Sequence, residues 1–305
     1  MQPFRAVPAA LIFGLLSFAS LAAAASAHAA TAADAKRCEN KALSQIPRRP
    51  EYAPTGRAFA RAVQHLSGPA RDTLVLAELR AGNVPSFLRR LVPVTIRGES
   101  SDHHPARVTV CVLPDYLAVG SDDDFMYVPM GLKAALDIAA SYGFVLPTSK
   151  LVDAIYAASP VKLNPQPLAA SDAMRSTAYV LYHSELIALQ RALHPEPLGT
   201  LTSGDKKDLV LTARLWNLPG RVAIYGWQRT GGVPIQPLST VHGARYADYS
   251  HGVRLVSSTV YVDGELPRRI EEVLADRELA PLLSNDGPLS HLAERLARLE
   301  ARLQN

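Results

Sequence analysis

Two short runs in which every second residue is apolar constrain the fold of this chain more than any other feature. The runs cover residues 92–97 and 108–112, where valine and isoleucine alternate with proline, threonine, arginine and cysteine. A period of two places the apolar side chains on one face of a strand. A polar stretch at residues 100–105 separates the runs. Together they predict a β-hairpin.

Helix-like and strand-like blocks alternate along the rest of the chain. Gly143 is a predicted helix stop and Thr148 a predicted N-cap. We expect helices near residues 57–66, 71–81 and 173–193, and two consecutive helices within residues 131–158. We expect further strands at residues 208–215, 221–227, 233–238 and 252–262. This order predicts an α+β fold, an antiparallel sheet with flanking helices.

The C-terminal segment carries a regular leucine pattern. The leucines step by three and four residues and fall at Leu289, Leu292, Leu296, Leu299 and Leu303. This spacing predicts an amphipathic helix. Two heptads fall short of the length that argues for a coiled coil. We therefore expect a helix docked on the body of the protein, with a dimer seam as the alternative.

Residues 1–30 have the three parts of a cleavable signal peptide. A single charge, Arg5, precedes an alanine-rich apolar run at residues 9–25, and the small-residue stretch Ala27-His28-Ala29 follows. A positive start, an apolar middle and an A-x-A-like end are what signal peptidase recognises. The sequence thus predicts export, cleavage near residue 29 or 30, and a secreted or periplasmic location.

The mature chain is predicted to hold one globular domain. Residues 31–56 are polar and punctuated by prolines, which indicates an extended N-terminal segment before a single α+β domain over residues 57–305. Loss of the leader lowers the formal charge from +4 to about +3. The basic residues are scattered, so we expect no nucleic-acid partner. No later stretch is long and apolar enough for a membrane span.

Two cysteines, Cys38 and Cys111, lie in the mature chain. In an oxidising compartment an even pair favours a disulfide. The alternative is two unpaired thiols. A bridge would tie the N-terminal segment to the predicted hairpin.

The segment 232–256 is the best candidate for a functional site. It contains His242, Asp248 and His251 within ten residues, and Gly243 and Gly252 leave the backbone open to a close approach by a ligand. Two imidazoles and a carboxylate can hold Zn²⁺ with a fourth position left for an activated water. They can equally form a metal-free acid–base site in which Asp248 orients a histidine. A purely structural loop is the remaining alternative.

Four sequence blocks resemble those of a family of exported bacterial proteins of uncharacterised activity. The blocks are PDYLAVGSDDDF at residues 114–125, LPTSKLVDAIY at 146–156, VAIYGW at 222–227 and YADYSHGVRLV at 246–256. The likeness covers most of residues 75–262. It implies export and brings no activity with it.

Residues 239–248 are also loosely similar to the zinc loop of metallopeptidases that cut bacterial cell-wall peptides, S-x-H-x-x-G-x-A-x-D. Ser239, His242, Ala247 and Asp248 supply the same ingredients in the same order. The histidine and the aspartate are one residue closer together here than in that pattern. The later H-x-H of those enzymes has no counterpart.

These observations lead to two hypotheses of different class. The first is an exported hydrolase that acts on a cell-envelope polymer or peptide. If it binds Zn²⁺, it is a metal-dependent amidase or peptidase. In this hypothesis the catalytic groups or metal ligands are His242, Asp248 and His251. The second is a non-catalytic envelope protein that binds a glycan or a protein partner through the same loop. Familiar signatures such as G-x-S-x-G or H-E-x-x-H are absent from the sequence.

Overall fold

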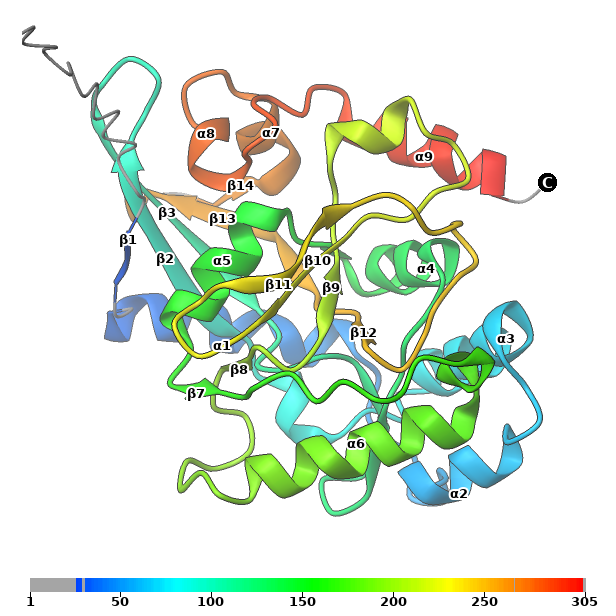
Figure 1. Ribbon diagram of the computed structural model, residues 1–305. Helices are drawn as coiled ribbons and strands as arrows, with labels where there is room; N and C mark the ends of the chain where they lie inside the picture. The colour runs from blue at the N-terminus through cyan, green and yellow to red at the C-terminus, as the bar shows by residue number, and fades with distance from the viewer. Residues whose placement is uncertain (1–25, 29–30, 266, 304–305) are drawn as a thin grey trace, which may run out of the picture.

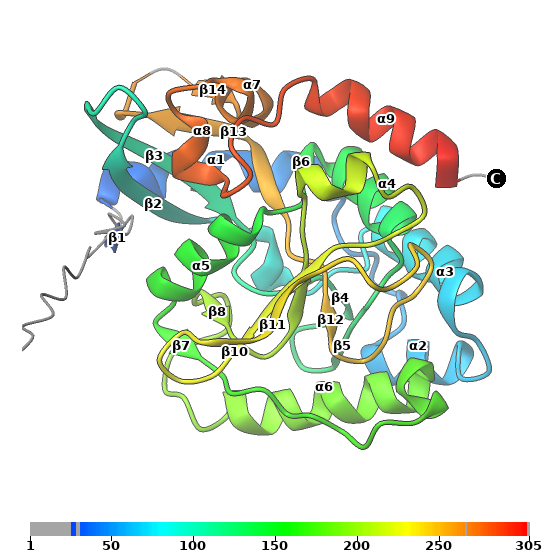
Figure 2. The same ribbon diagram turned by 45° about the horizontal axis from the view of Figure 1, so that its top comes forward.

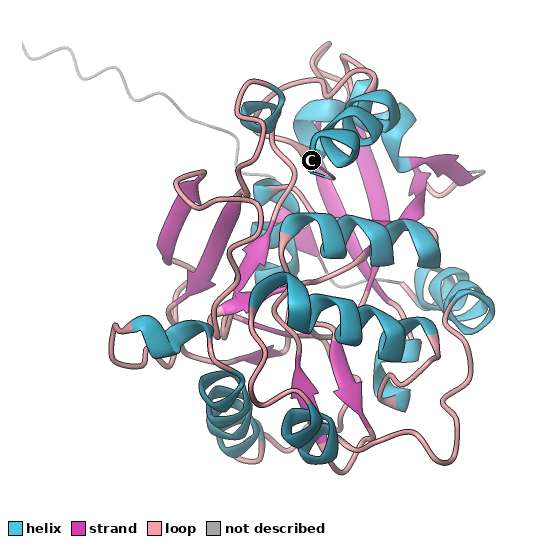
Figure 3. Cartoon of the chain, turned by 90° about the vertical axis from the view of Figure 1, so that its right-hand side faces the viewer, coloured by secondary structure: helices cyan, strands magenta, loops and turns pink. Residues whose placement is uncertain are grey.

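The computed structural model describes residues 26–28, 31–265 and 267–303, and within them the chain has a mixed α+β architecture (Figure 1). Helices pack against the strands on several sides, and some strands reach the edge of the molecule (Figure 3). The buried apolar side chains form a core that extends from the sheets to the helices packed on them. The α+β prediction, with an antiparallel sheet and a C-terminal helix, is confirmed.

The larger sheet is antiparallel and is built around the predicted hairpin. Its strands follow the order β1-β2-β3-β13-β14, and β6 also pairs with β13. The bounds are β1 Ser26–His28, β2 Val92–Glu99, β3 Pro105–Val112, β6 Phe144–Val145, β13 Val256–Val262 and β14 Pro267–Arg269. Strands β2 and β3 pair along their full length, from Val92 opposite Val112 to Glu99 opposite Pro105. The hairpin prediction is therefore confirmed.

A second sheet carries the segment with the candidate site. Its order is β11-β10-β9-β12, in which β12 runs parallel to β9 and the other neighbours are antiparallel. The bounds are β9 Lys207–Leu209, β10 Ile224–Gln228, β11 Pro234–Ser239 and β12 His251–Gly252. Two small two-stranded sheets pair β4 Ala118–Gly120 with β5 Phe125–Tyr127, and β7 Val161–Lys162 with β8 Thr202–Ser203.

Helices lie near each of the predicted positions, and α1, α7 and α8 are present in addition. Helix α4 ends at Gly143, whose φ of 71° is left-handed, and the Thr148 side chain caps α5 by accepting a hydrogen bond from the Leu151 amide. The bounds are α1 Ala32–Gln45, α2 Gly56–Ala62, α3 Gly68–Arg80, α4 Leu132–Tyr142, α5 Ser149–Ala158, α6 Thr177–Arg191, α7 Ile270–Ala275, α8 Ala280–Leu283 and α9 Leu292–Leu303. Short 3₁₀ helices cover Ser86–Arg89, Asp172–Arg175 and Ala213–Trp216.

Two local predictions are wrong. The segment 31–56 is not extended throughout, because α1 occupies its first half. Thr31 and Asp34 form a reciprocal capping box there, and the first of the helix-breaking prolines, Pro47, comes only after the helix ends. The strand predicted for residues 208–215 stops at Leu209, and a 3₁₀ helix follows a few residues later. Thr212 accepts a hydrogen bond from the Arg214 amide and begins that turn.

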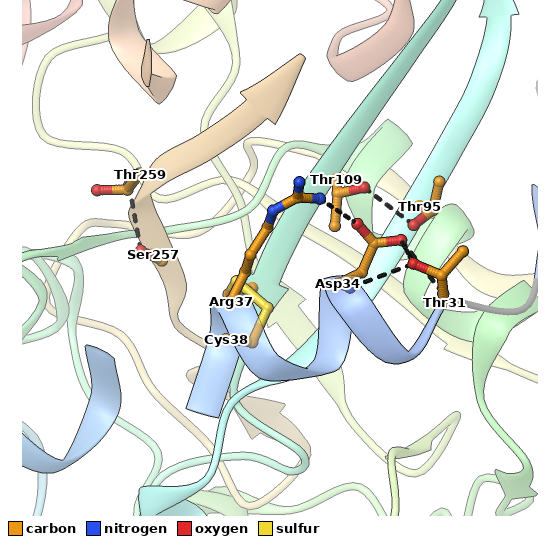
Figure 4. The surroundings of a disulfide bond; sticks show 9 residues. Thr31, Asp34, Arg37, Cys38, Thr95, Thr109, Ser257 and Thr259 are labelled. Atoms are coloured by element: carbon orange, nitrogen blue, oxygen red, sulfur yellow. Dashed lines mark hydrogen bonds and ion pairs between the residues drawn. A yellow bond between two sulfur atoms is a disulfide. The ribbon is translucent and has the colours of Figure 1, made fainter. Parts of the chain in front are cut away.

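A disulfide joins α1 to the central strand of the larger sheet (Figure 4). Cys38 and Cys111 are bonded, both are fully buried, and no free cysteine is present among the described residues. The disulfide prediction is confirmed. Because such bonds persist in oxidising compartments, the bridge fits a secreted protein.

The C-terminal helix α9 lies on the surface over α4 and α7, as Figure 2 shows. Leu292 and Leu299 of α9 point into the core, and the arginines of this helix are exposed. The predicted docking of this helix on the body of the protein is confirmed. No helix within the described residues is long and apolar enough to cross a membrane. The signal-peptide prediction falls on residues 1–30, most of which lie outside the described part of the chain.

Candidate functional site

The loop between β11 and β12 is held to the protein by backbone hydrogen bonds along its length. The Val222 amide donates to the His242 carbonyl at 3.1 Å, and the Leu132 amide donates to the Ala244 carbonyl at 2.7 Å. The second bond ties the loop to the start of α4, beside which the loop runs in Figure 1. The segment is therefore a fixed scaffold for its side chains.

Three rings of this loop pack together. His242 stacks on Tyr246 with ring centroids 4.2 Å apart and the planes inclined by only 7°. His251 meets the edge of Tyr246 at 5.7 Å and lies 6.0 Å from His242. The two predicted histidines are thus brought together. We call His242, Tyr246, Asp248 and His251 the histidine cluster.

Asp248 is anchored within its own loop. One carboxylate oxygen accepts hydrogen bonds from the Ser250 amide at 2.8 Å and the Ser250 hydroxyl at 2.6 Å. The other accepts one from the Tyr246 hydroxyl at 3.0 Å. Burial alone raises the pKa of Asp248, but nearby His251 and the Ser250 hydrogen bonds bring this pKa below its usual value. Asp248 is therefore charged and fixes the position of Tyr246.

His251 is fully buried. Within the described part of the chain, neither of its ring nitrogens has a hydrogen-bond partner. Burial lowers the pKa of His251 to about 4, and the attraction of Asp248 only partly opposes this shift. The imidazole is consequently neutral at neutral pH and offers one donor and one acceptor. Leaving such groups unpaired costs about 1–3 kcal/mol each, which makes His251 a candidate for a functional role.

His242 and Lys207 lie closer to the solvent. His242 is partly exposed, and burial lowers its pKa, which keeps the ring neutral at pH 7. Lys207 stands opposite His251 in the β9–β12 pairing, and its ammonium group lies 4.7 Å from the centre of the Trp227 ring. Burial lowers the pKa of Lys207, whereas Asp248 opposes the shift. A cation thus borders the two imidazoles.

The zinc hypothesis finds no support in this geometry. The described residues contain no group of three or more His, Cys, Asp or Glu side chains placed to hold a metal ion. At this loop both oxygens of Asp248 accept hydrogen bonds from Tyr246 and Ser250, and no third ligand is placed with the two histidines among the described residues. We therefore derive no chemical step through a metal.

Only one of the two glycines fits the predicted opening toward a ligand. A β-carbon on Gly252 would lie 2.5 Å from a ring carbon of Tyr116 and 2.8 Å from the β-carbon of Lys206. Gly252 is therefore required by packing between β12 and its neighbours. A β-carbon on Gly243 would meet nothing closer than 3.9 Å, so this position alone is open.

A buried charged network lies behind the cluster. Lys206 donates hydrogen bonds to the Tyr249 carbonyl at 2.7 Å and pairs with a ring nitrogen of His183 at 2.9 Å. Tyr116 donates to Asp208 at 2.8 Å, and Arg254 lies 3.9 Å from the same carboxylate. These side chains are buried, and they support the strand that carries His251.

This network could not be predicted from the sequence. Neighbouring apolar positions do not reveal which charged side chains point inward. A usable signal was present in residues 201–211, where several charged residues interrupt an otherwise apolar and small-residue run.

Comparison with known proteins adds no identification. No protein-family model matches the sequence, and no curated protein or solved structure matches it either. The resemblance to exported bacterial proteins stays a prediction, and function must be argued from the site.

Proposed function

We propose that the protein is an exported hydrolase in which His242, supported by Tyr246, Asp248 and His251, acts as a metal-independent acid–base group. The observation that carries the proposal is the pairing of two neutral imidazoles, 6.0 Å apart, one partly exposed and one buried with both nitrogens free of partners within the described chain. Neutral imidazole is the usual general base at neutral pH.

In this proposal His242 takes a proton from the attacking water. Its position is set by the stacked Tyr246 ring, which in turn donates its hydroxyl hydrogen bond to Asp248. Burial and nearby Asp248 raise the pKa of Tyr246 to about 12, so the phenol keeps its proton and holds this geometry at neutral pH. Asp248 is accordingly a positioning residue.

His251 and Lys207 complete the site. The imidazolium that His242 becomes gives the proton from water to the leaving amine, while buried His251 stays neutral and packs against the edge of the Tyr246 ring on which His242 stacks. Lys207 supplies positive charge beside the site, which stabilises the negative charge that develops on the oxygen of the attacked bond. The bond is an amide of a cell-envelope polymer or peptide, the material available to an exported protein.

The test is hydrolysis of purified bacterial cell wall by the mature protein, followed as release of free amino groups. We expect His242→Ala to lower the rate by about 10²- to 10⁴-fold, the usual contribution of a general base. The matched control is His104→Ala, because the His104 side chain is 80% exposed in the β2–β3 loop. No release by the wild-type protein, or equal rates for wild type and His242→Ala, contradicts the proposal.

A zinc-dependent form of the same hydrolase is tested on the same samples. Elemental analysis of the purified protein gives the zinc content, and a chelator is added to the activity assay. The metal-independent proposal predicts no stoichiometric zinc and unchanged activity with the chelator. Stoichiometric zinc that is lost in His242→Ala would instead establish the metal form, with ligands rearranged from the geometry described above.

A second candidate function is non-catalytic binding of an envelope glycan or protein. The observation that favours it is the burial of Asp248 and His251, which are 1% and 0% exposed. A protein that sediments with purified cell wall, releases no amino groups and loses this association in a folded His242→Ala variant would be such a binder.

A further inference from the structure

A cavity of about 370 Å³ opens directly beside the histidine cluster. The residues that line it include Arg175, Arg245, Arg302 and Tyr246, together with Gly220 and Gly243. Tyr246 belongs to both places, since its ring stacks on His242 and lies 5.6 Å from the guanidinium carbon of Arg175. A molecule in the cavity therefore lies next to the proposed catalytic imidazole.

The charge of this cavity has one sign. Its three arginines come from separate parts of the chain, namely the 3₁₀ helix Asp172–Arg175, the loop between β11 and β12, and the end of α9. No aspartate or glutamate lines it, and none of the three arginines forms an ion pair within residues 26–28, 31–265 and 267–303.

A fourth guanidinium strengthens the positive potential. Arg71 is buried behind Arg175 and donates a hydrogen bond to its carbonyl at 3.0 Å. Among the described residues, two other nitrogens of Arg71 have no hydrogen-bond partner. The adjacent Asp72 offsets part of this charge, and it lines a neighbouring depression rather than this cavity.

We propose that this arginine cavity binds an anionic group, a carboxylate or a phosphate, carried by the ligand that reaches the histidine cluster. Guanidinium groups match the geometry of both anions. The cavity volume lies within the range of small-ligand sites. The inference rests on the proposed function only for the position of the reacting bond; binding of the anion does not require catalysis.

The experiment is calorimetric titration of the mature protein with inorganic phosphate, N-acetylalanine and N-acetylalanine amide. We expect phosphate or N-acetylalanine to bind at low ionic strength, the stronger of the two identifying the anion. The uncharged amide is expected to bind at least tenfold more weakly. Binding of neither anion, or equal binding of N-acetylalanine and its amide, overturns the inference.

Variants assign the binding to the cavity. Arg175→Gln, Arg245→Gln and Arg302→Gln are each expected to weaken anion binding about tenfold, because each removes a charge-assisted contact. Arg298→Gln is the matched control, since Arg298 lies one turn earlier on α9, contacts Glu294 and does not line the cavity. Equal losses in the control and the cavity variants overturn the assignment.

The outcome is separable from that of the proposed hydrolysis. His242→Ala is expected to keep the anion affinity of the wild-type protein, because His242 does not line the cavity. Anion binding without any hydrolysis would leave the cavity assignment intact and remove only the catalytic proposal.

Discussion

Loss of the disulfide between Cys38 and Cys111 is predicted to destabilise the protein by about 4 kcal/mol. The two residues are 73 positions apart, and in the chain-entropy model a closed loop of that length removes roughly 15 cal/mol/K from the unfolded state. At 25 °C this corresponds to about 4.4 kcal/mol. For about 275 described residues the unfolding entropy is on the order of 0.6 kcal/mol/K. The melting temperature should therefore fall by about 7 °C.

The assay is thermal unfolding of the mature protein followed by circular dichroism, with and without a reductant. Reduction of the wild-type protein isolates the covalent bond, since it leaves every other side chain in place. The double variant Cys38→Ala with Cys111→Ala should melt at least as low as the reduced protein and respond no further to reductant. A shift below about 2 °C on full reduction, verified by thiol counting, would refute the reasoning.

Three further predictions concern individual side chains. Tyr246→Phe leaves one oxygen of Asp248 without its donor, so it should lower the free energy of unfolding by about 1–3 kcal/mol in urea titration; an unchanged midpoint contradicts this. Burial raises the pKa of Asp72 from 3.8 to about 6, so the folded protein retains a proton that the unfolded chain releases, and stability is lost as the pH rises from about 4 to 6. Asp72→Asn should thus stabilise the protein by up to about 3 kcal/mol above pH 6 and change little below pH 4; a pH-independent difference would argue against it. Gly252→Ala should cost about 1–3 kcal/mol through overpacking, whereas Gly243→Ala should be nearly neutral; equal melting temperatures would contradict the packing role.

The parts of the fold that follow from local rules could be predicted from the sequence. The period-two pattern of residues 92–97 and 108–112 predicts the hairpin because a strand places alternate residues on one face. Thr148 and Gly143 mark helix ends through hydrogen bonds and a backbone conformation that their own chemistry favours. The disulfide followed from the count of cysteines and the expected compartment.

Other features depend on contacts between distant residues and could not be predicted in this way. The pairing of β12 with β9 places His251 opposite Lys207, and no local pattern encodes that register. The arginine cavity joins Arg175, Arg245 and Arg302, which lie far apart along the chain. Helix α1 ends before the prolines that predict an extended segment for residues 31–56, and Thr31 and Asp34 form the capping signal that marks its start.

The candidate site was predicted in part. The proximity of His242 and His251 was expected from their separation of nine residues in a glycine-flanked loop, and the structure places their rings 6.0 Å apart. The hydrogen bonds that Asp248 accepts from Tyr246 and Ser250 were not predicted. A turn whose carboxylate accepts hydrogen bonds from its own loop has the same sequence pattern as a turn whose carboxylate faces a ligand.

Chemical rescue of His242→Ala by free imidazole tests the central claim most directly. The His242 ring is partly exposed and stacks on Tyr246, so its removal leaves a site that imidazole from solution can enter. If His242 is the general base, the rate of amino-group release from cell wall should rise with the concentration of unprotonated imidazole. A folded His242→Ala protein that gains no activity with imidazole, while the wild-type protein hydrolyses the same material, would contradict that role.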